Sequence, residues 1–154
     1  RPAASRRCHV DEAAMPQLVI NWRVVLTESG ATKRPSRVVL SLPEAMLDAV
    51  TAVSGSGPAY LFLLAESMLA AAHDLGFGEE TARTLVVGTL DGAVALLRDR
   101  GRPPAEIRAE VTSRGGTTEA ATALWIERGV PQAMVEAILA AAARAKELGH
   151  GPRI

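Results

Sequence analysis

The sequence predicts an all-α fold, a helical bundle that follows a short leader of different composition. Three observations lead to this prediction. From Pro43 onward alanine, leucine, glutamate and arginine predominate. Glycine or proline recurs in this part at places where helices begin and end. The chain has 154 residues, enough for one domain, and 48% of them are hydrophobic, which argues against intrinsic disorder.

The leader, residues 1–36, shows no sustained period. Residues 18–26 and 37–42 are rich in β-branched and other apolar side chains, and a turn-rich segment separates them. We expect residues 1–36 to be poorly ordered or to join a short hairpin, and residues 37–154 to form the helical domain. The leader is basic, but it has one aromatic residue and no binding motif, so nucleic-acid binding is not expected.

Helix-breaking residues divide the remainder into six predicted helices. Proline stands near the start of four of them, a pair of glutamates begins the third, and glycine follows most of the ends. The segment from Gly55 to Pro58 is expected to separate the first two. The predicted helices are 44–53, 58–75, 79–100, 104–112, 117–128 and 131–148.

Two of these helices are too apolar for a small isolated domain. Helix 58–75 is apolar on nearly all sides, so nearly all of its surface must be buried. Helix 79–100 carries Gly88 and Gly92, which each cost about 1 kcal/mol relative to alanine unless a neighbouring helix approaches closely. We expect an intertwined homo-oligomer, with a compact monomeric bundle as the alternative.

Several classes of protein are not expected. Cys8 is the single cysteine and the three histidines are scattered, so neither a disulfide framework nor a metal site is predicted. Glu66 and Ser67 interrupt the longest apolar run before it reaches the roughly 18 residues of a membrane span. The basic start lacks the apolar core of a signal peptide. A cytoplasmic protein without membrane partners is expected.

Two loops have compositions that suit ligand binding. The first precedes a predicted helix and contains two hydroxyls and backbone amides that could hold an anion or polar ligand. It lacks the third glycine and the preceding parallel strand of a dinucleotide fingerprint, and a tight turn between helices is the alternative. Its residues are Ser54, Gly55, Ser56, Gly57 and Pro58.

The second loop leads into the helix predicted at 117–128. A glycine pair lets backbone amides turn inward, and the helix start adds partial positive charge, so a carboxylate would fit there. Simple N-capping by a threonine is the alternative. The polar and glycine residues of this loop are Ser113, Gly115, Gly116, Thr117 and Thr118.

Both loops lie in longer motifs. Residues 48–60 (DAVTAVSGSGPAY) and 110–121 (EVTSRGGTTEAA) resemble the C-terminal domain of pyrroline-5-carboxylate reductase, with helices of matching spacing between them. The resemblance implies an all-helical domain that interleaves with a partner as a homodimer, and dimers that assemble into decamers. It also implies reduction of 1-pyrroline-5-carboxylate to L-proline with NADPH or NADH, without a metal.

The resemblance assigns roles by position. Ser113, Gly115, Gly116, Thr117 and Thr118 would surround the substrate carboxylate. Thr118 would also hydrogen-bond the ring nitrogen, as the catalytic residue of this chain. The first loop, from Ser54 to Pro58, would border the nicotinamide.

Two departures from the family pattern bear on function. Arg114 stands where the family usually has proline. Residues 1–36 contain no glycine fingerprint of a Rossmann domain, which would bind most of the cofactor. The chain is therefore expected to be the C-terminal part of a reductase, inactive alone. A non-catalytic helical oligomerisation module is the alternative. Whether the chain is a fragment, a truncated reading frame or a stand-alone protein stays open.

Overall fold

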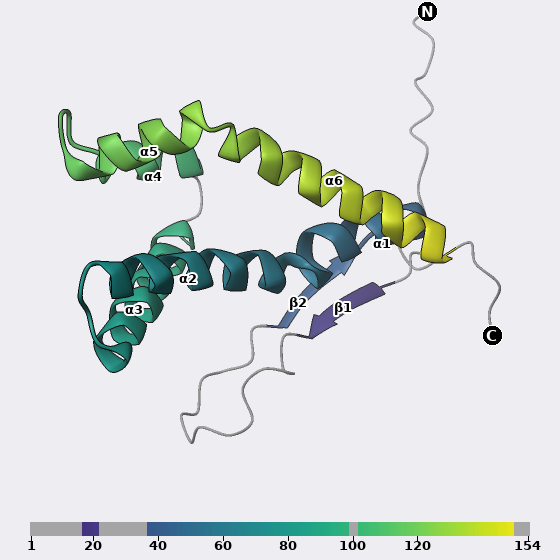
Figure 1. Ribbon diagram of the computed structural model, residues 1–154. Helices are drawn as coiled ribbons and strands as arrows, with labels where there is room; N and C mark the ends of the chain where they lie inside the picture. The colour runs from purple at the N-terminus through teal and green to yellow at the C-terminus, as the bar shows by residue number, and fades with distance from the viewer. Residues whose placement is uncertain (1–16, 22–36, 99–101, 150–154) are drawn as a thin grey trace, which may run out of the picture.

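The computed structural model describes residues 17–21, 37–98 and 102–149 (Figure 1). Two short strands precede a series of helices. The elements are β1 (Gln17–Asn21), β2 (Arg37–Ser41), the 3-10 turn η3 (Glu44–Met46), α1 (Leu47–Val50), the π-helical turn η4 (Thr51–Gly55), α2 (Gly57–Asp74), α3 (Glu79–Leu97), α4 (Pro104–Glu110), α5 (Thr117–Glu127) and α6 (Val130–Gly149).

Each helix predicted after Pro43 is found as helix, with ends that differ by up to three residues, but the first two are not separated as predicted. Residues 99 and 100 of the helix predicted at 79–100 lie outside the described residues. The all-α prediction for this region therefore holds. Helix α3 begins after Gly78, whose extended backbone forms the N-cap, and Glu79 and Glu80 follow in the first turn, where the helix dipole favours acidic residues. Helix α2 ends before Gly76, whose φ of 91° is a left-handed conformation that favours glycine.

Strands β1 and β2 pair antiparallel, in the register Gln17 opposite Ser41 through Asn21 opposite Arg37. Strand β2 lies inside the predicted stretch 37–42, and β1 begins one residue before the predicted stretch 18–26. The remainder of the predicted leader, residues 1–16 and 22–36, lies outside the described residues.

The segment from Gly55 to Pro58 does not break the chain into two helices, so that prediction is wrong. The Ser56 amide donates to the carbonyl of Thr51 at 2.8 Å, five residues back, which is the hydrogen-bond pattern of a π-turn. Pro58 is tolerated because it lies in the first turn of α2, where its missing amide is not needed. The helical path therefore runs from Glu44 to Asp74.

Side-chain hydroxyls stabilise this π-turn. The hydroxyl of Tyr60 donates to the Ala52 carbonyl at 3.0 Å and ties the start of α2 back to η4. The Ser54 hydroxyl donates to the carbonyl of Val50 at 2.9 Å. The small residues that suggested a loop or tight turn are thus compatible with helix, because the Ser54 hydroxyl bonds within the helix and Tyr60 ties it to α2.

The continuity of this helix also changes the membrane argument. The helix Glu44–Asp74 is long and apolar enough to cross a membrane, judged by length and composition alone. The prediction that Glu66 and Ser67 keep the apolar segment shorter than a membrane span was therefore wrong, because it treated residues 44–53 as a separate helix. A helix at the centre of a protein assembly meets the same criterion.

The helices form two arms that meet near α1 (Figure 1). One arm holds α2 and α3, and the other holds α4, α5 and α6, with α6 packed on α1 and η4. Between them lies an apolar groove of about 300 Å³. Residues from both sides line it, and none is charged: Tyr60, Leu63, Leu64 and Ser67 from α2, and Val130, Ala133, Met134, Ala137 and Ile138 from α6.

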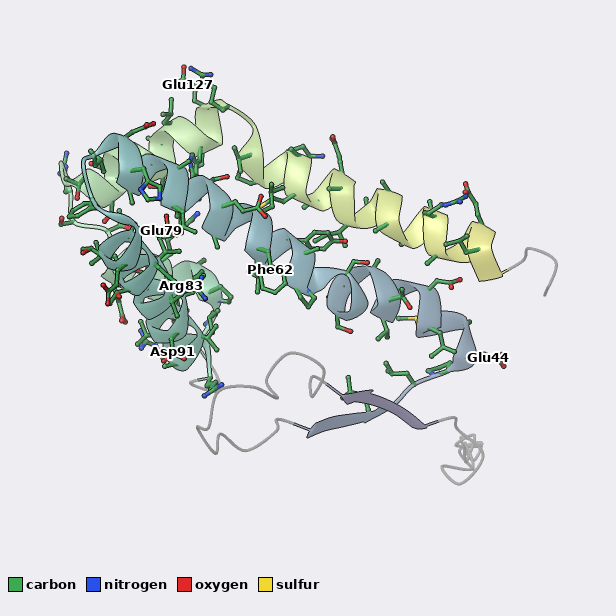
Figure 2. All side chains as sticks on the ribbon, turned by 60° about the horizontal axis from the view of Figure 1, so that its bottom comes forward. Glu44, Phe62, Glu79, Arg83, Asp91 and Glu127 are labelled. Atoms are coloured by element: carbon green, nitrogen blue, oxygen red, sulfur yellow. The ribbon has the colours of Figure 1, made fainter. Side chains whose placement is uncertain are left out.

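The described chain has a very small core. Its buried apolar residues are Ala52, Ala72, Ala82, Val86 and Ile107, and no large side chain among the described residues is completely buried. Large apolar side chains are instead exposed on every long helix. Phe62, for example, is 55% exposed and projects from α2 away from α6 (Figure 2).

The glycines of α3 do not mark a helix crossing inside this chain. A Cβ atom added at Gly88 or at Gly92 would meet nothing within 4 Å among the described residues. The close approach predicted from their spacing is therefore absent from the single chain, and any such approach must come from another one.

Candidate substrate loop and its surroundings

The loop before α5 has a defined backbone geometry. Gly115 has a φ of 72°, the left-handed region that glycine adopts without strain. Gly116 then forms the extended N-cap of α5, and its amide donates to the Ser113 carbonyl at 3.0 Å. The double glycine predicted to turn the chain into the helix does so.

Gly116 is confined by its own loop. A Cβ atom at this position would lie 2.4 Å from the Ser113 hydroxyl oxygen and 3.0 Å from the Ser113 carbonyl oxygen. The hydroxyl could rotate away, but the carbonyl is fixed by the turn. Gly116 is thus needed for the observed loop geometry.

We expect Gly116→Ala to lower the free energy of unfolding by about 1–2 kcal/mol, because the added methyl group forces the turn apart. Urea denaturation checks this. Gly78→Ala is the matched control: Gly78 is likewise an extended N-cap, a Cβ there meets nothing within 4 Å, and the change should lower stability by less than about 1 kcal/mol. Equal stability of the two variants would show that the loop adapts.

A carboxylate already occupies this loop. The Gly115 amide donates to a side-chain oxygen of Glu119 at 2.6 Å. Charged hydrogen bonds of this length are among the stronger ones in proteins. The sequence analysis did not single out Glu119, although its place in the first turn of α5 is typical of a residue that reaches back to a helix start.

Thr117 and Thr118 lie in the first turn of α5. Within the described part of the chain, no protein group hydrogen-bonds either hydroxyl. Threonines farther along the helices, such as Thr84 and Thr122, donate to the carbonyl four residues back. Thr117 and Thr118 have no helical carbonyl at that distance, so their hydroxyls remain available to a ligand.

Thr118 lines one end of a hollow of about 340 Å³ on the side of α5. The other lining residues are Thr117, Ala121, Thr122 and Trp125. The sequence analysis missed the last three. Their spacing of three, four and seven residues from Thr118, which places them on one helix face, could have indicated them.

The other predicted residues lie elsewhere. Ser54, Gly55 and Ser56 belong to η4 or its end, and Gly57 and Pro58 begin α2. In Figure 1 this segment lies next to α1, whereas the loop before α5 lies near the opposite end of the second arm. A single chain therefore does not bring the two predicted parts of the site together. No group of residues suited to hold a metal occurs among the described residues.

Fold and loop together define a helical domain with large exposed apolar side chains and, at one end, a glycine turn whose Gly115 amide holds the Glu119 carboxylate. The chain belongs to the pyrroline-5-carboxylate reductase dimerisation family, whose profile matches residues 44–148.

Individual proteins similar to this chain belong to the same family. The chain is 44% identical over 111 residues to the pyrroline-5-carboxylate reductase of Corynebacterium melassecola, and 47% identical over 105 residues to that of Pseudomonas aeruginosa. The two alignments cover 72% and 68% of this chain but only 41% and 38% of the relatives. The crystal structure of Plasmodium falciparum pyrroline carboxylate reductase with NADP bound matches with a TM-score of 0.67 and 29% identity, over 70% of this chain and 44% of that one.

Proposed function

We propose that this chain supplies the dimerisation surface and the substrate carboxylate loop of a reductase that converts 1-pyrroline-5-carboxylate to L-proline with NADPH or NADH. The observation that carries the proposal is the Gly115 amide, which already holds a carboxylate at 2.6 Å. The loop lies inside the region that matches the family.

Different residues of the loop are proposed to bind different parts of the substrate. The turn formed by Ser113, Gly115 and Gly116 places the amides of the first turn of α5, which have no helical carbonyl partner, near the substrate carboxylate, and Thr117 adds a hydroxyl. The Gly115 amide would join them once the substrate carboxylate displaces that of Glu119. Thr118, whose hydroxyl has no partner in the described chain, holds the ring nitrogen. Positioning of this kind brings the imine carbon within reach of a hydride donor and accounts for much of the rate of such a reaction.

The described residues do not fit the whole cofactor. The backbone of Ser54 to Gly57 is engaged in the π-turn and the start of α2, so it offers no cradle for a pyrophosphate. These residues and Pro58 could border a nicotinamide that another segment holds. We propose that the cofactor is bound mainly outside this chain, and that the chain alone is inactive.

The assembly proposed here is a homodimer in which a helix of a second copy enters the apolar groove between α2 and α6. The groove has no charged lining residue, and the small core leaves each chain with unburied apolar surface. Association also lets one chain bring its η4 segment toward the loop of the other. Decamers would be a further assembly of such dimers.

We further propose a cytoplasmic protein with the apolar helix covered by protein, without nucleic-acid or membrane partners. In this scheme residues 37–154 form the dimerisation and substrate-loop domain, preceded by residues 1–36 as a leader.

Sedimentation equilibrium tests the association directly. At micromolar concentration we expect the chain to sediment with twice its 16.2 kDa mass or a multiple of that, because the exposed helices cannot be buried otherwise. A single species of monomer mass across this concentration range would contradict the proposal.

A further inference from the structure

The hollow on α5 combines a hydroxyl with an aromatic wall. Thr118, Ala121 and Trp125 lie on one face of the helix. Side chains on a helix lean toward its N-terminus, so the Trp125 side chain is expected to lean toward the turn that contains Ala121. Trp125 and the small Ala121 both line the hollow of about 340 Å³.

The polar groups of the hollow are unevenly distributed. The hydroxyl of Thr122 donates to the Thr118 carbonyl at 2.8 Å, so it is already satisfied. The hydroxyl of Thr118 has no partner within the described chain. The indole is 49% exposed, and no charged side chain lines the hollow. The hollow therefore joins an unpartnered hydroxyl at Thr118, near the start of α5, to the aromatic side chain of Trp125.

We propose that Trp125 is a specificity-determining residue whose indole face binds the cationic nitrogen and methylene groups of the five-membered ring. This inference rests on the proposed function, which places the substrate carboxylate at Gly115. The imine nitrogen is cationic when it is protonated, and the nitrogen of the product is an ammonium. A cation over an indole face is attracted by the ring quadrupole, and the ring methylenes gain apolar contact.

Nuclear magnetic resonance of the 154-residue chain tests this with L-proline as the probe. Cyclopentanecarboxylate, which has the same ring size and carboxylate but no nitrogen, is the matched control ligand. We expect L-proline to shift the amides of Gly115 and Gly116 and the Trp125 indole N–H with one common Kd. Trp22→Phe assigns the two indole signals.

Three variants test whether the Trp125 indole contributes to L-proline binding. Trp125→Leu should weaken L-proline binding about fivefold, as expected for a lost cation–π contact, and should reduce the preference for L-proline over cyclopentanecarboxylate at least threefold. Trp125→Phe should restore part of that preference. Leu124→Ala removes an equally exposed apolar side chain outside the hollow and should change neither value.

The outcomes separate the two proposals. If L-proline shifts the glycine amides but leaves the Trp125 indole unchanged, the carboxylate loop stands and the role of Trp125 is overturned. If neither signal moves at saturating L-proline, the proposed function of the loop fails and the inference fails with it. If Trp125→Leu instead dissociates the dimer in sedimentation, the indole is an interface contact and not a wall of the ligand site.

Discussion

Leu63→Glu is expected to dissociate the dimer, weakening self-association by at least about a hundredfold. Leu63 lines the groove between α2 and α6 and is 64% exposed in the single chain, so a second copy would bury it. A carboxylate buried there without a partner costs several kcal/mol, and a hundredfold loss corresponds to about 2.7 kcal/mol. Sedimentation equilibrium measures the loss. Thermal unfolding at several protein concentrations should show the concentration dependence of Tm disappear.

Leu97→Glu is the control. Leu97 is the last residue of α3, is 54% exposed, and does not line the groove, so the same change there should leave the dimer intact. If both variants dissociate equally, the groove is not the specific contact. If Leu63→Glu remains a dimer with the wild-type affinity, the copies associate through another face.

The second prediction with a large effect concerns the reductase activity of the chain, alone and fused to a Rossmann domain. The chain alone should show no NADPH-dependent reduction of 1-pyrroline-5-carboxylate, since the described residues offer no cradle for the pyrophosphate. A Rossmann domain from a relative, fused ahead of Val38, should restore activity. In that fusion Thr118→Ala should lower kcat/KM about 10- to 100-fold, because a hydrogen bond to a charged ring nitrogen contributes about 1.5–3 kcal/mol.

Thr84→Ala serves as the matched control for this fusion. The Thr84 hydroxyl bonds only to the Glu80 carbonyl on α3, so its removal should leave kcat/KM unchanged. Turnover by the unfused chain would overturn the division of roles. A fusion that dimerises but gains activity only with Arg114→Pro would favour the non-catalytic oligomerisation module.

Much of the fold could be predicted from the sequence because the helix ends are marked locally. Gly76 and Gly78 end α2 and begin α3, and Pro103 precedes α4, each through a conformational preference of its own backbone. The π-turn at Thr51–Gly55 could not be read in this way. Its glycine and serine residues are typical of a loop, and the hydrogen bonds that favour the helix, such as that from Tyr60 to Ala52, leave no mark in the residue types.

The candidate site was predicted only in part. The turn formed by the glycine pair could be predicted because glycine before a helix start has a clear physical meaning, whereas the role of Thr118 comes from the resemblance and stays a prediction. Glu119 was missed because a glutamate in a first turn is common, and only its contact with Gly115 gives it significance. Trp125 was missed because a single aromatic residue on a helix is usually part of a core, whereas here it is half exposed.

The π-turn also determines which way the long helix faces. A π-turn contains one residue more than the corresponding α-helical turn, and each residue of an α-helix advances the side chains by about 100°. The apolar side chains before η4 and those after it are therefore out of phase along one continuous axis. Residues 47–55 can contact α6 while α2 packs against α3. The additional residue of the π-turn thus lets one long helix contact α6 through its first part and α3 through its second part.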